Sequence, residues 1–424
     1  GVGYIGYGLI GKRHLLDFQE QSDVANIAVA EAHAGRMEEA RQLMGDGARG
    51  YRDFRALLDD KRVDAVVIST PDHWHALQTM LACAAGKDVY VEKPLTLFVR
   101  EGRWMIDVAK RHERVVTVGT QQRSGPHYAR ARQLLIDGAL GKISSVQMAA
   151  ARNIMPGYGR PADSPPPADL DWEMWQGSAP AHAYNPNRAI YHFRWFWDYS
   201  GGQMTNLGAH ALDIVHWALG VAGPTAVSSA GGRFSLLDNG ETPDTQEVIF
   251  EYPGFIATWS HREACASSTT PVPLEFFGPR GRMSLTRSNL LLTPDRKVIP
   301  VNTVPQFTDA HPVGGPQPVP DNGPREFWTA AIDDKTGNAR EQLKAHVRNF
   351  LDCVKSRQQP VSDLESSHRV ATACHLANLS LRLGRKLKWD AAKEEILDDT
   401  EANRLLVRPY RAPWDREFRA LGIG

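Results

Sequence analysis

The chain has 424 residues, of which 42% are apolar and 23% charged, a composition typical of a folded protein long enough for two domains. The 49 Lys and Arg residues balance the 49 Asp and Glu residues, so no excess charge draws the surface to nucleic acid or lipid headgroups. The four cysteines are scattered, without a Cys-x-x-Cys pair, which argues against a disulfide scaffold. We therefore expect neither a nucleic-acid partner nor a membrane partner.

The cellular location is predicted from what the first residues show. No apolar run reaches the roughly 18 residues needed to cross a bilayer, and the start lacks the pattern of an export signal. Residues 2–5 already have the pattern of a strand, so we expect the sequence to begin inside an element. The sequence as it stands predicts a cytoplasmic protein, with export left open because of that abrupt start.

The first part of the chain alternates short apolar runs with helical patterns, the order expected of a parallel sheet covered by crossover helices. Thr70-Pro71 ends the β-branched run before it, and Gly86 is a residue type suited to a helix end. Helices are predicted at 11–21, 34–44 and 75–85. Strands are predicted at 2–5, 27–30, 63–69, 89–91 and 115–119.

The remainder of the chain has a different pattern, which predicts an α+β domain with a large, mostly antiparallel, open sheet. Loops are expected where Pro and Gly accumulate, at 160–167 and 300–324. The helical pattern returns at 341–383, and 386–414 is predicted to be an extended tail. We place the boundary between domains 1–123 and 124–424. A helix is expected at 128–137 and strands at 143–151, 225–229, 245–252, 255–260 and 274–277.

A glycine-rich turn follows the first strand and opens the first helix, which is the context that gives a Gly-x-Gly-x-x-Gly pattern its meaning. Such glycines allow a tight turn and the close approach of a pyrophosphate to the helix N-terminus. Glu31 lies twenty residues after Gly11, at a position where a carboxylate accepts hydrogen bonds from a ribose. This position favours NAD, while the nearby Arg36 keeps NADP as the alternative. The other interpretation is a structural turn in a protein that binds no nucleotide. The turn comprises Gly6, Gly8, Leu9, Ile10 and Gly11.

Two further segments, together with this turn, resemble the Gfo/Idh/MocA family of oxidoreductases, named after glucose-fructose oxidoreductase and inositol dehydrogenase. The first is Glu92-Lys93-Pro94, after a predicted strand, and it is similar to the Glu-Lys-Pro motif of that family. The second is the glycine-rich entry to a helix at 201–213, which carries His210. The resemblance implies an N-terminal Rossmann domain, a C-terminal substrate domain, and a homo-oligomer such as a dimer or tetramer.

The resemblance also implies roles for individual residues. Lys93 would hold the reacting oxygen beside the nicotinamide, and His210 would act as general acid or base. Asn206 stands where the family usually has aspartate, and an amide cannot stabilise an imidazolium by charge. The resemblance further implies that the cofactor is bordered by Thr70, Pro71, His73, His75, Glu92, Lys93 and Gln121.

Some of these residues have a second interpretation. His73 and His75 share a His-x-His pattern that can bind a metal, but no cluster of further ligands completes it, so we predict no metal site. Gln121 and Arg123 follow the last strand of the first domain and are interpreted either as residues of the cleft or as a polar hinge.

The segment 191–199 is strongly aromatic, which suits both a sugar-binding wall and buried packing. Within it, substrate contact is favoured for His192, Arg194 and Tyr199. The full set of predicted substrate-binding residues is Lys93, Arg123, His192, Arg194, Tyr199, Asn206 and His210.

Three functions are compatible with the sequence. The leading hypothesis is an NAD(P)-dependent oxidoreductase that transfers a hydride between the nicotinamide and a secondary hydroxyl or keto group of a sugar, glycoside or polyol. The second is a glycoside-cleaving enzyme that oxidises the sugar transiently and then eliminates the aglycone. The third is a cofactor-binding protein without catalysis, which the replacement of aspartate by Asn206 leaves open.

Overall fold

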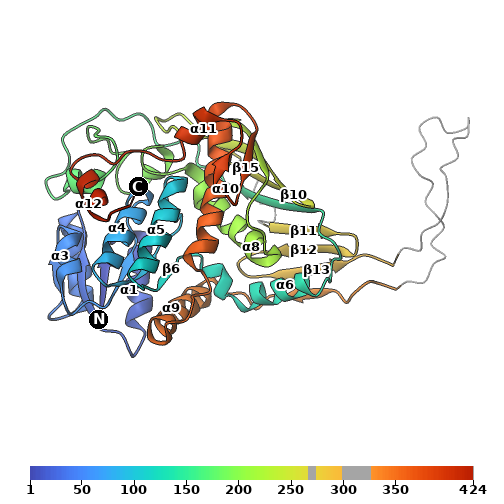
Figure 1. Ribbon diagram of the computed structural model, residues 1–424, viewed down its shortest axis with the longest axis horizontal. Coiled ribbons are helices and arrows are strands. Elements are labelled where there is room, and N and C mark those ends of the chain that lie inside the picture. Colours follow the sequence, from blue (N-terminus) through green and yellow to red (C-terminus); the bar gives the residue numbers. More distant parts are fainter. Residues whose placement is uncertain (266–273, 298–325, 424) are drawn as a thin grey trace, which may run out of the picture.

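The computed structural model describes residues 1–265, 274–297 and 326–423, so the predicted loop at 300–324 lies outside the described residues. Its strands form two sheets, which lie at opposite ends of the molecule with α10 (Leu364–Leu383) between them (Figure 1). This arrangement confirms the predicted fold class. In the described part of the chain, no helix combines the length and the apolar character that crossing a membrane requires.

The first sheet has six parallel strands in the order β3-β2-β1-β4-β5-β6. Its central strands are fully buried on both faces, as expected for runs such as Ala-Val-Val-Ile in β4. Five of the strands were predicted; β3 was not, because Arg-Gly-Tyr is a short, largely exposed edge strand without an apolar pattern. The strands are β1 (Val2–Ile5), β2 (Asn26–Ala30), β3 (Arg49–Tyr51), β4 (Ala65–Ile68), β5 (Asp88–Val91) and β6 (Val116–Val118).

Crossover helices cover this sheet, as the alternating pattern predicts. The prediction that the fourth helix begins at residue 75 is wrong, because it begins at Asp72, directly after Pro71. Proline has the backbone angle that precedes a helix, and the carboxylate of Asp72 lies in the first turn, where the helix dipole favours negative charge. The helices are α1 (Leu9–Gln19), α2 (Ala34–Met44), α3 (Phe54–Asp59), α4 (Asp72–Ala84) and α5 (Val99–Arg111).

The second sheet has ten strands in the order β14-β13-β12-β11-β7-β10-β9-β8-β15-β16, and every pairing except β7 with β10 is antiparallel. The sheet is open, since β14 and β16 do not pair with each other. The strands are β7 (Ser145–Ala151), β8 (Ala226–Gly232), β9 (Thr245–Tyr252), β10 (Phe255–Arg262), β11 (Leu274–Gly278), β12 (Gly281–Leu285), β13 (Leu290–Pro294), β14 (Ile332–Asp334), β15 (Leu387–Asp390) and β16 (Glu395–Ile396).

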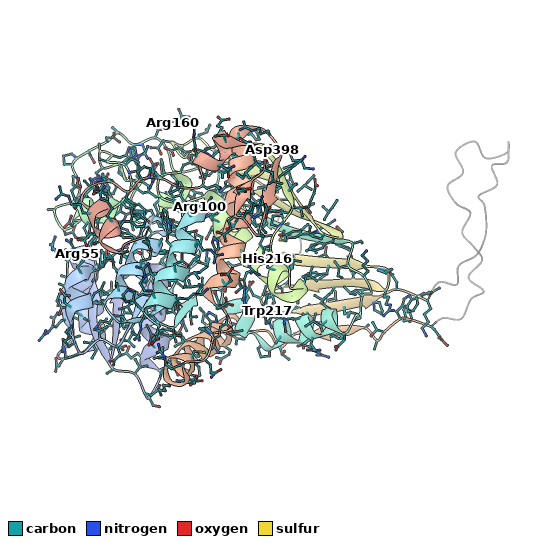
Figure 2. The ribbon with its side chains drawn as sticks, viewed as in Figure 1. Arg55, Arg100, Arg160, His216, Trp217 and Asp398 are labelled. Carbon is teal, nitrogen blue, oxygen red and sulfur yellow. The ribbon has the colours of Figure 1, made fainter. Side chains whose placement is uncertain are left out.

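One face of this sheet packs against α6 (Pro126–Ile136) and α8 (Ala209–Leu219) around the buried side chains of Phe250, Trp259 and Phe276. His216 of α8 points into this core, where its Nε2 lies 2.7 Å from the hydroxyl of Tyr252 (Figure 2). Ala209, Leu212, Val215 and Ala218 of α8 belong to the same core, so the helix packs through one apolar face.

The C-terminal part of the chain returns to the first sheet. Phe350 of α9 (Ala339–Ser356) shares a core with β1 and β4, and Trp414 of α12 (Trp414–Ala420) stacks on Phe54 of α3 at 5.9 Å between ring centroids. The predicted extended tail at 386–414 is wrong, because it contains β15, β16 and α11 (Thr400–Arg404). The boundary after residue 123 stays a prediction.

Candidate active site

A cavity of about 550 Å³ opens at the carboxyl ends of β1, β2, β4 and β5, which is where open parallel sheets bind ligands. One side is formed by the turns that follow these strands. The other side is formed by segments that precede the second sheet or connect its strands, including α7 (Trp172–Gln176), η2 (His192–Trp195) and η3 (Met204–Gly208). The cavity therefore lies between the two halves of the molecule.

The glycine turn after β1 lines the cavity with Gly6, Gly8, Leu9 and Ile10. Gly6 has φ +87°, and a Cβ there would lie 2.8 Å from the backbone nitrogen of Thr70. A Cβ on Gly11 would lie 2.4 Å from the carbonyl oxygen of Gly6, so the first turn of α1 packs directly on this loop. Gly8 has no neighbour within 4 Å of the same position, and Leu9 is 79% exposed at the helix N-terminus. The turn thus leaves room for a phosphate group beside free backbone N–H groups.

Glu31 is held at the end of β2 by two backbone hydrogen bonds. Its Oε2 accepts from the backbone nitrogen of Tyr7 at 2.6 Å, and its Oε1 accepts from that of His33 at 3.0 Å. These bonds orient the carboxylate beside the glycine turn, where a ribose would lie. Arg36 and Arg52 line the same region of the cavity. A dinucleotide therefore fits the residues that are present.

The loop after β4 contributes Thr70, Pro71 and His75 to the cavity wall. His75 is fixed by two backbone carbonyl groups, with Nδ1 2.7 Å from the oxygen of Pro94 and Nε2 2.8 Å from that of Thr70. His73 does not line the cavity, because its ring is buried with Nε2 3.1 Å from the carbonyl oxygen of Trp175. Within the described ranges, no three His, Cys, Asp or Glu side chains are grouped in a way that could hold a metal ion.

Lys93 lines the cavity and lies shortly after β5 (Asp88–Val91). Its Nζ donates hydrogen bonds to the backbone oxygen and to the side-chain Oδ1 of Asn206, both at 3.0 Å. Glu92 beside it is buried, with Oε1 2.7 Å from Nε2 of His14 and Oε2 accepting from the backbone nitrogen of Lys93 at 3.1 Å. Gln121 also lines this part of the cavity.

Asn206 and His210 both line the cavity, although the helix that carries them is not regular. Residues Met204–Gly208 form a π-helical turn, η3, that continues into α8. His210 is 6% exposed, and its ring makes no hydrogen bond with any residue in the described part of the chain. A buried imidazole without a partner, facing a cavity, is available to a ligand.

The electrostatic surroundings lower the pKa values of both Lys93 and His210. Burial lowers the pKa of Lys93 to about 8, while Glu92 opposes this change and Arg194 adds to it. Burial lowers the pKa of His210 well below its usual value, and the positive charges of Lys93 and Arg287 lower it further. At neutral pH, His210 is therefore a neutral imidazole beside a lysine close to its titration range.

Asn206 is also the start of a polar chain that leads away from the cavity. Its Nδ2 donates to Oε1 of Gln203 at 3.1 Å, and Nε2 of Gln203 donates to Oε1 of Glu263 at 2.7 Å. Glu263 in turn accepts from Nε of Arg152 at 2.7 Å. These contacts fix the orientation of the Asn206 amide, so that its oxygen faces Lys93.

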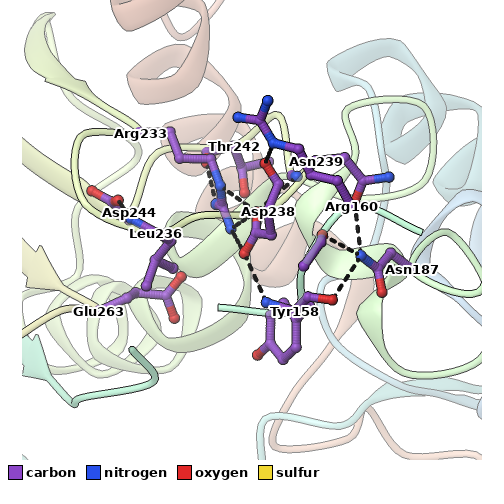
Figure 3. Close-up of polar contacts among 12 residues, drawn as sticks. Tyr158, Arg160, Asn187, Arg233, Leu236, Asp238, Asn239, Thr242, Asp244 and Glu263 are labelled. Atoms are coloured by element: carbon purple, nitrogen blue, oxygen red, sulfur yellow. Dashed lines mark hydrogen bonds and ion pairs between the residues drawn. The ribbon is translucent and has the colours of Figure 1, made fainter. Parts of the chain in front are cut away.

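A network around Asp238 fixes the loops behind the aromatic segment (Figure 3). Asp238 accepts from Nε of Arg233 at 2.7 Å and from the backbone nitrogen of Tyr158 at 3.2 Å. Asn187 donates to Oδ1 of Asn239 at 2.8 Å. Asn187 is three residues before Ile190, which lines the cavity, so the network holds the chain near that part of the wall.

Three predicted substrate residues lie outside the cavity lining. Arg123 is 3% exposed and forms a bidentate ion pair with Asp213, Nη2 to Oδ1 at 2.6 Å and Nε to Oδ2 at 2.9 Å. Tyr199 is completely buried and contacts Trp175. His192 packs on Tyr158 with 3.7 Å between ring centroids. Of the segment 191–199, Arg194 does line the cavity.

Several residues that line the cavity were not identified from the sequence. Arg287, from the turn between β12 and β13, approaches Lys93 and His210 closely enough to influence their pKa values. Trp175 and Ile190 also line the cavity. Arg287 lies in a short turn without any motif, so only the folded structure brings it to the site.

Comparisons with known proteins agree with this geometry. Residues 1–120 match a family model described as the oxidoreductase family, NAD-binding Rossmann fold, and residues 153–230 and 331–416 match the C-terminal alpha/beta domain of the same family. The chain belongs to the Gfo/Idh/MocA family of oxidoreductases, and its first domain is an NAD-binding Rossmann domain.

The similar proteins include several oxidoreductases. An uncharacterized oxidoreductase of Synechocystis is 27% identical over 304 residues, 68% of this chain and 72% of that protein. Inositol 2-dehydrogenase/D-chiro-inositol 3-dehydrogenase of Lactiplantibacillus plantarum is 32% identical over 145 residues, only 33% of this chain and 41% of that protein. Levoglucosan dehydrogenase in complex with NADH and L-sorbose has the same fold, with TM-score 0.66 and 19% identity over 91% of this chain and 98% of that one.

Proposed function

We propose that this protein is a dehydrogenase that transfers a hydride between NAD and a secondary hydroxyl or keto group of a sugar or polyol. The observation that carries the proposal is the position of Lys93. Its Nζ is held 3.0 Å from the Oδ1 of Asn206, in the same cavity as the glycine turn and the imidazole of His210. The named substrates of the inositol and levoglucosan dehydrogenases support the substrate class.

The chemistry divides between the cofactor and the side chains. When bound, the nicotinamide supplies the hydride acceptor or donor. His210 accepts the proton of the reacting hydroxyl at a ring nitrogen, which its lowered pKa keeps free of a proton at neutral pH. Lys93, as an ammonium, donates a hydrogen bond to the reacting oxygen, and Asn206 holds the Lys93 side chain in that position.

The choice of NAD over NADP rests on Glu31. Its carboxylate is fixed beside the glycine turn, where it would accept from the ribose hydroxyls and repel a 2′-phosphate. Arg36 and Arg52 line the same end of the cavity and are the residues that would hold that phosphate. Glu31→Ser is therefore expected to shift the preference from NAD towards NADP, measured as the ratio of the two kcat/KM values.

The function is tested by turnover on a panel of sugars and polyols with NAD, followed by NADH absorbance. Lys93→Met and His210→Gln are each expected to lower kcat about 100-fold or more, the usual contribution of proton transfer by a placed side chain. Lys110→Met, on the exposed face of α5, is the matched control and keeps full activity. Full turnover in the Lys93 variant would contradict the proposal.

The same assay separates the alternatives. Release of an aglycone from glycosides without net NADH would instead indicate transient oxidation followed by elimination. A protein that binds NAD but turns over nothing would be a non-catalytic binder. Assembly into a dimer or tetramer and a cytoplasmic location stay predictions.

A further inference from the structure

Three cations converge on the part of the cavity that faces the second sheet. Lys93 follows β5, Arg194 comes from η2, and Arg287 comes from the turn between β12 and β13. They are close enough to interact: burial lowers the pKa of Lys93, and the positive charges of both arginines add to that effect. Such a cluster is unfavourable unless something of opposite charge binds there.

Neither arginine forms an ion pair within the described residues. Nη1 of Arg194 donates to the carbonyl oxygen of Tyr191 at 3.1 Å, and its guanidinium lies 4.6 Å from the ring centroid of Phe193. The guanidinium of Arg287 has no hydrogen bond or ion pair to any residue in those ranges. Nearby arginines differ, since Arg408 pairs with Asp198 at 2.7 Å.

The carboxylates of this region are already engaged. Glu92 is buried against His14, and Asp72 is buried and accepts a hydrogen bond from the hydroxyl of Ser200. Asn206, which accepts a hydrogen bond from Lys93, is a neutral amide. Glu92 and Asp72 counter part of the charge of Lys93, because both raise its pKa. No carboxylate of the described residues forms an ion pair with Arg194 or Arg287.

We propose, building on the proposed function, that the substrate is an anionic sugar or polyol whose carboxylate or phosphate group is bound between Arg194 and Arg287. A planar guanidinium binds either group through two parallel hydrogen bonds. The anion would then orient the rest of the substrate, with its reacting hydroxyl towards Lys93 and His210. Neutral polyols of the same length would bind more weakly.

The test measures binding to the full chain loaded with NADH, so that the probes are not oxidised. Isothermal titration calorimetry compares D-glucitol with D-gluconate and with D-glucitol 6-phosphate, which share one carbon skeleton and differ in charge. At least one of the two anions is expected to bind about tenfold more tightly than D-glucitol. Tighter binding of D-gluconate would identify the bound group as a carboxylate, and tighter binding of D-glucitol 6-phosphate would identify it as a phosphate. Arg287→Gln is expected to reduce this preference to less than about threefold.

Two controls make the result specific. Arg282→Gln changes an exposed arginine on the same hairpin that does not line the cavity, and it is expected to keep the full preference. The Kd for NADH is expected to be unchanged in Arg194→Gln and Arg287→Gln. A large loss of NADH affinity would overturn the inference, because the arginines would then serve the cofactor.

The inference is also overturned if neither anion binds more tightly than D-glucitol, or if the preference survives in both arginine variants. These outcomes are separable from those of the proposed function. A charge preference without any turnover would retain the anion site and reject the dehydrogenase. Turnover of neutral polyols that depends on Lys93, without a charge preference, would do the reverse.

Discussion

Asn206 is the single residue whose identity most affects the site. It accepts two hydrogen bonds from Lys93 and is itself oriented by Gln203, but it adds no negative charge to the cavity. With an aspartate at this position, Lys93 would have a carboxylate as its partner instead of an amide. The asparagine therefore adds no negative charge to oppose the effect of burial on the pKa of Lys93. It also supplies no negative charge that would stabilise the protonated form of His210.

Asn206→Asp is expected to raise the pKa of Lys93 from about 8 by about one unit, because an opposite charge at hydrogen-bond distance favours the ammonium. The pKa of His210 rises for the same reason. The alkaline limb of the pH profile of kcat/KM, where Lys93 loses its proton, then moves to higher pH. The measurement is NADH formation over about pH 6 to 10, and an alkaline limb at the same pH in both proteins would contradict the assignment.

The structure places Lys93 and His210 in the cavity, whereas residues with distant partners, such as Arg123, lie outside its lining. The roles of all these residues stay predictions. Lys93 and His210 belong to motifs, so their approach follows from the fold of the whole family. Arg123 was interpreted as a residue of the cleft or hinge, but Asp213, ninety positions later, holds it in a buried ion pair. Such a pairing cannot be read from the neighbours of either residue in the chain.

Among the elements, the glycine turn and the first turn of α1 determine how the cofactor end of the cavity is shaped. Gly6 combines a positive φ with a backbone neighbour, so a side chain there meets both strain and a clash. Elements with clear patterns, such as β4 and α2, were predicted well. The strands β12, β13 and β14 were missed because they are short and depend on pairing with one another for their stability.

Gly6→Ala is expected to raise the Kd for NAD at least tenfold, because the new Cβ would displace the loop that meets the pyrophosphate. Gly86→Ala is the matched control. It also has a positive φ, +78°, but no atom lies within 4 Å of the added Cβ, so it should lower the Tm without changing the Kd. Equal effects of the two variants on the Kd would show that the turn does not bind the cofactor.

Considered as a whole, the molecule is two sheets held together by contacts that cross between them. The ion pair of Arg123 with Asp213 is central among these, since both side chains are 1% exposed. Helix α10 packs on α5 of the first half and on α8 of the second. The general two-part design was predictable, whereas the return of α9 and α12 to the first sheet was not, because their partners are hundreds of residues away.

Arg123→Ala is expected to lower the free energy of unfolding by about 3–5 kcal/mol, because Asp213 would be left buried without a partner. Arg130→Ala removes an ion pair with Asp334 in which the arginine is 52% exposed, and should cost less than about 1 kcal/mol. Urea unfolding followed by circular dichroism compares the two. Similar losses would mean that the buried pair is not a major contributor.

The pH dependence of stability follows from histidines that are buried as neutral rings. Burial lowers their pKa values below the 6.5 of an exposed histidine, so between those values the unfolded chain binds protons that the folded chain does not. The contribution of these histidines to the free energy of unfolding is therefore at its maximum above pH 6.5 and falls as the pH drops towards 4. For each proton that only the unfolded chain binds, the free energy of unfolding falls by about 1.4 kcal/mol per unit decrease in pH. The histidines are His73 and His216, with pKa about 3, and His261, His346 and His375, with pKa about 4.

Urea titrations between pH 4 and 7.5 measure how the free energy of unfolding changes with pH. The Arg130→Ala protein is the reference: it keeps the same histidines, so it should show the same pH dependence at a slightly lower stability. A free energy of unfolding that stays constant from pH 6.5 to 4.5 would contradict the account of these buried rings.

The most direct test of the central claim is a crystal structure of the protein soaked with NAD. We expect a pyrophosphate on the backbone of Gly8 and Leu9, and a nicotinamide ring in contact with the side chains of Lys93 and His210. A nicotinamide ring bound away from both side chains, or a glycine turn that leaves the pyrophosphate unbound, would contradict it.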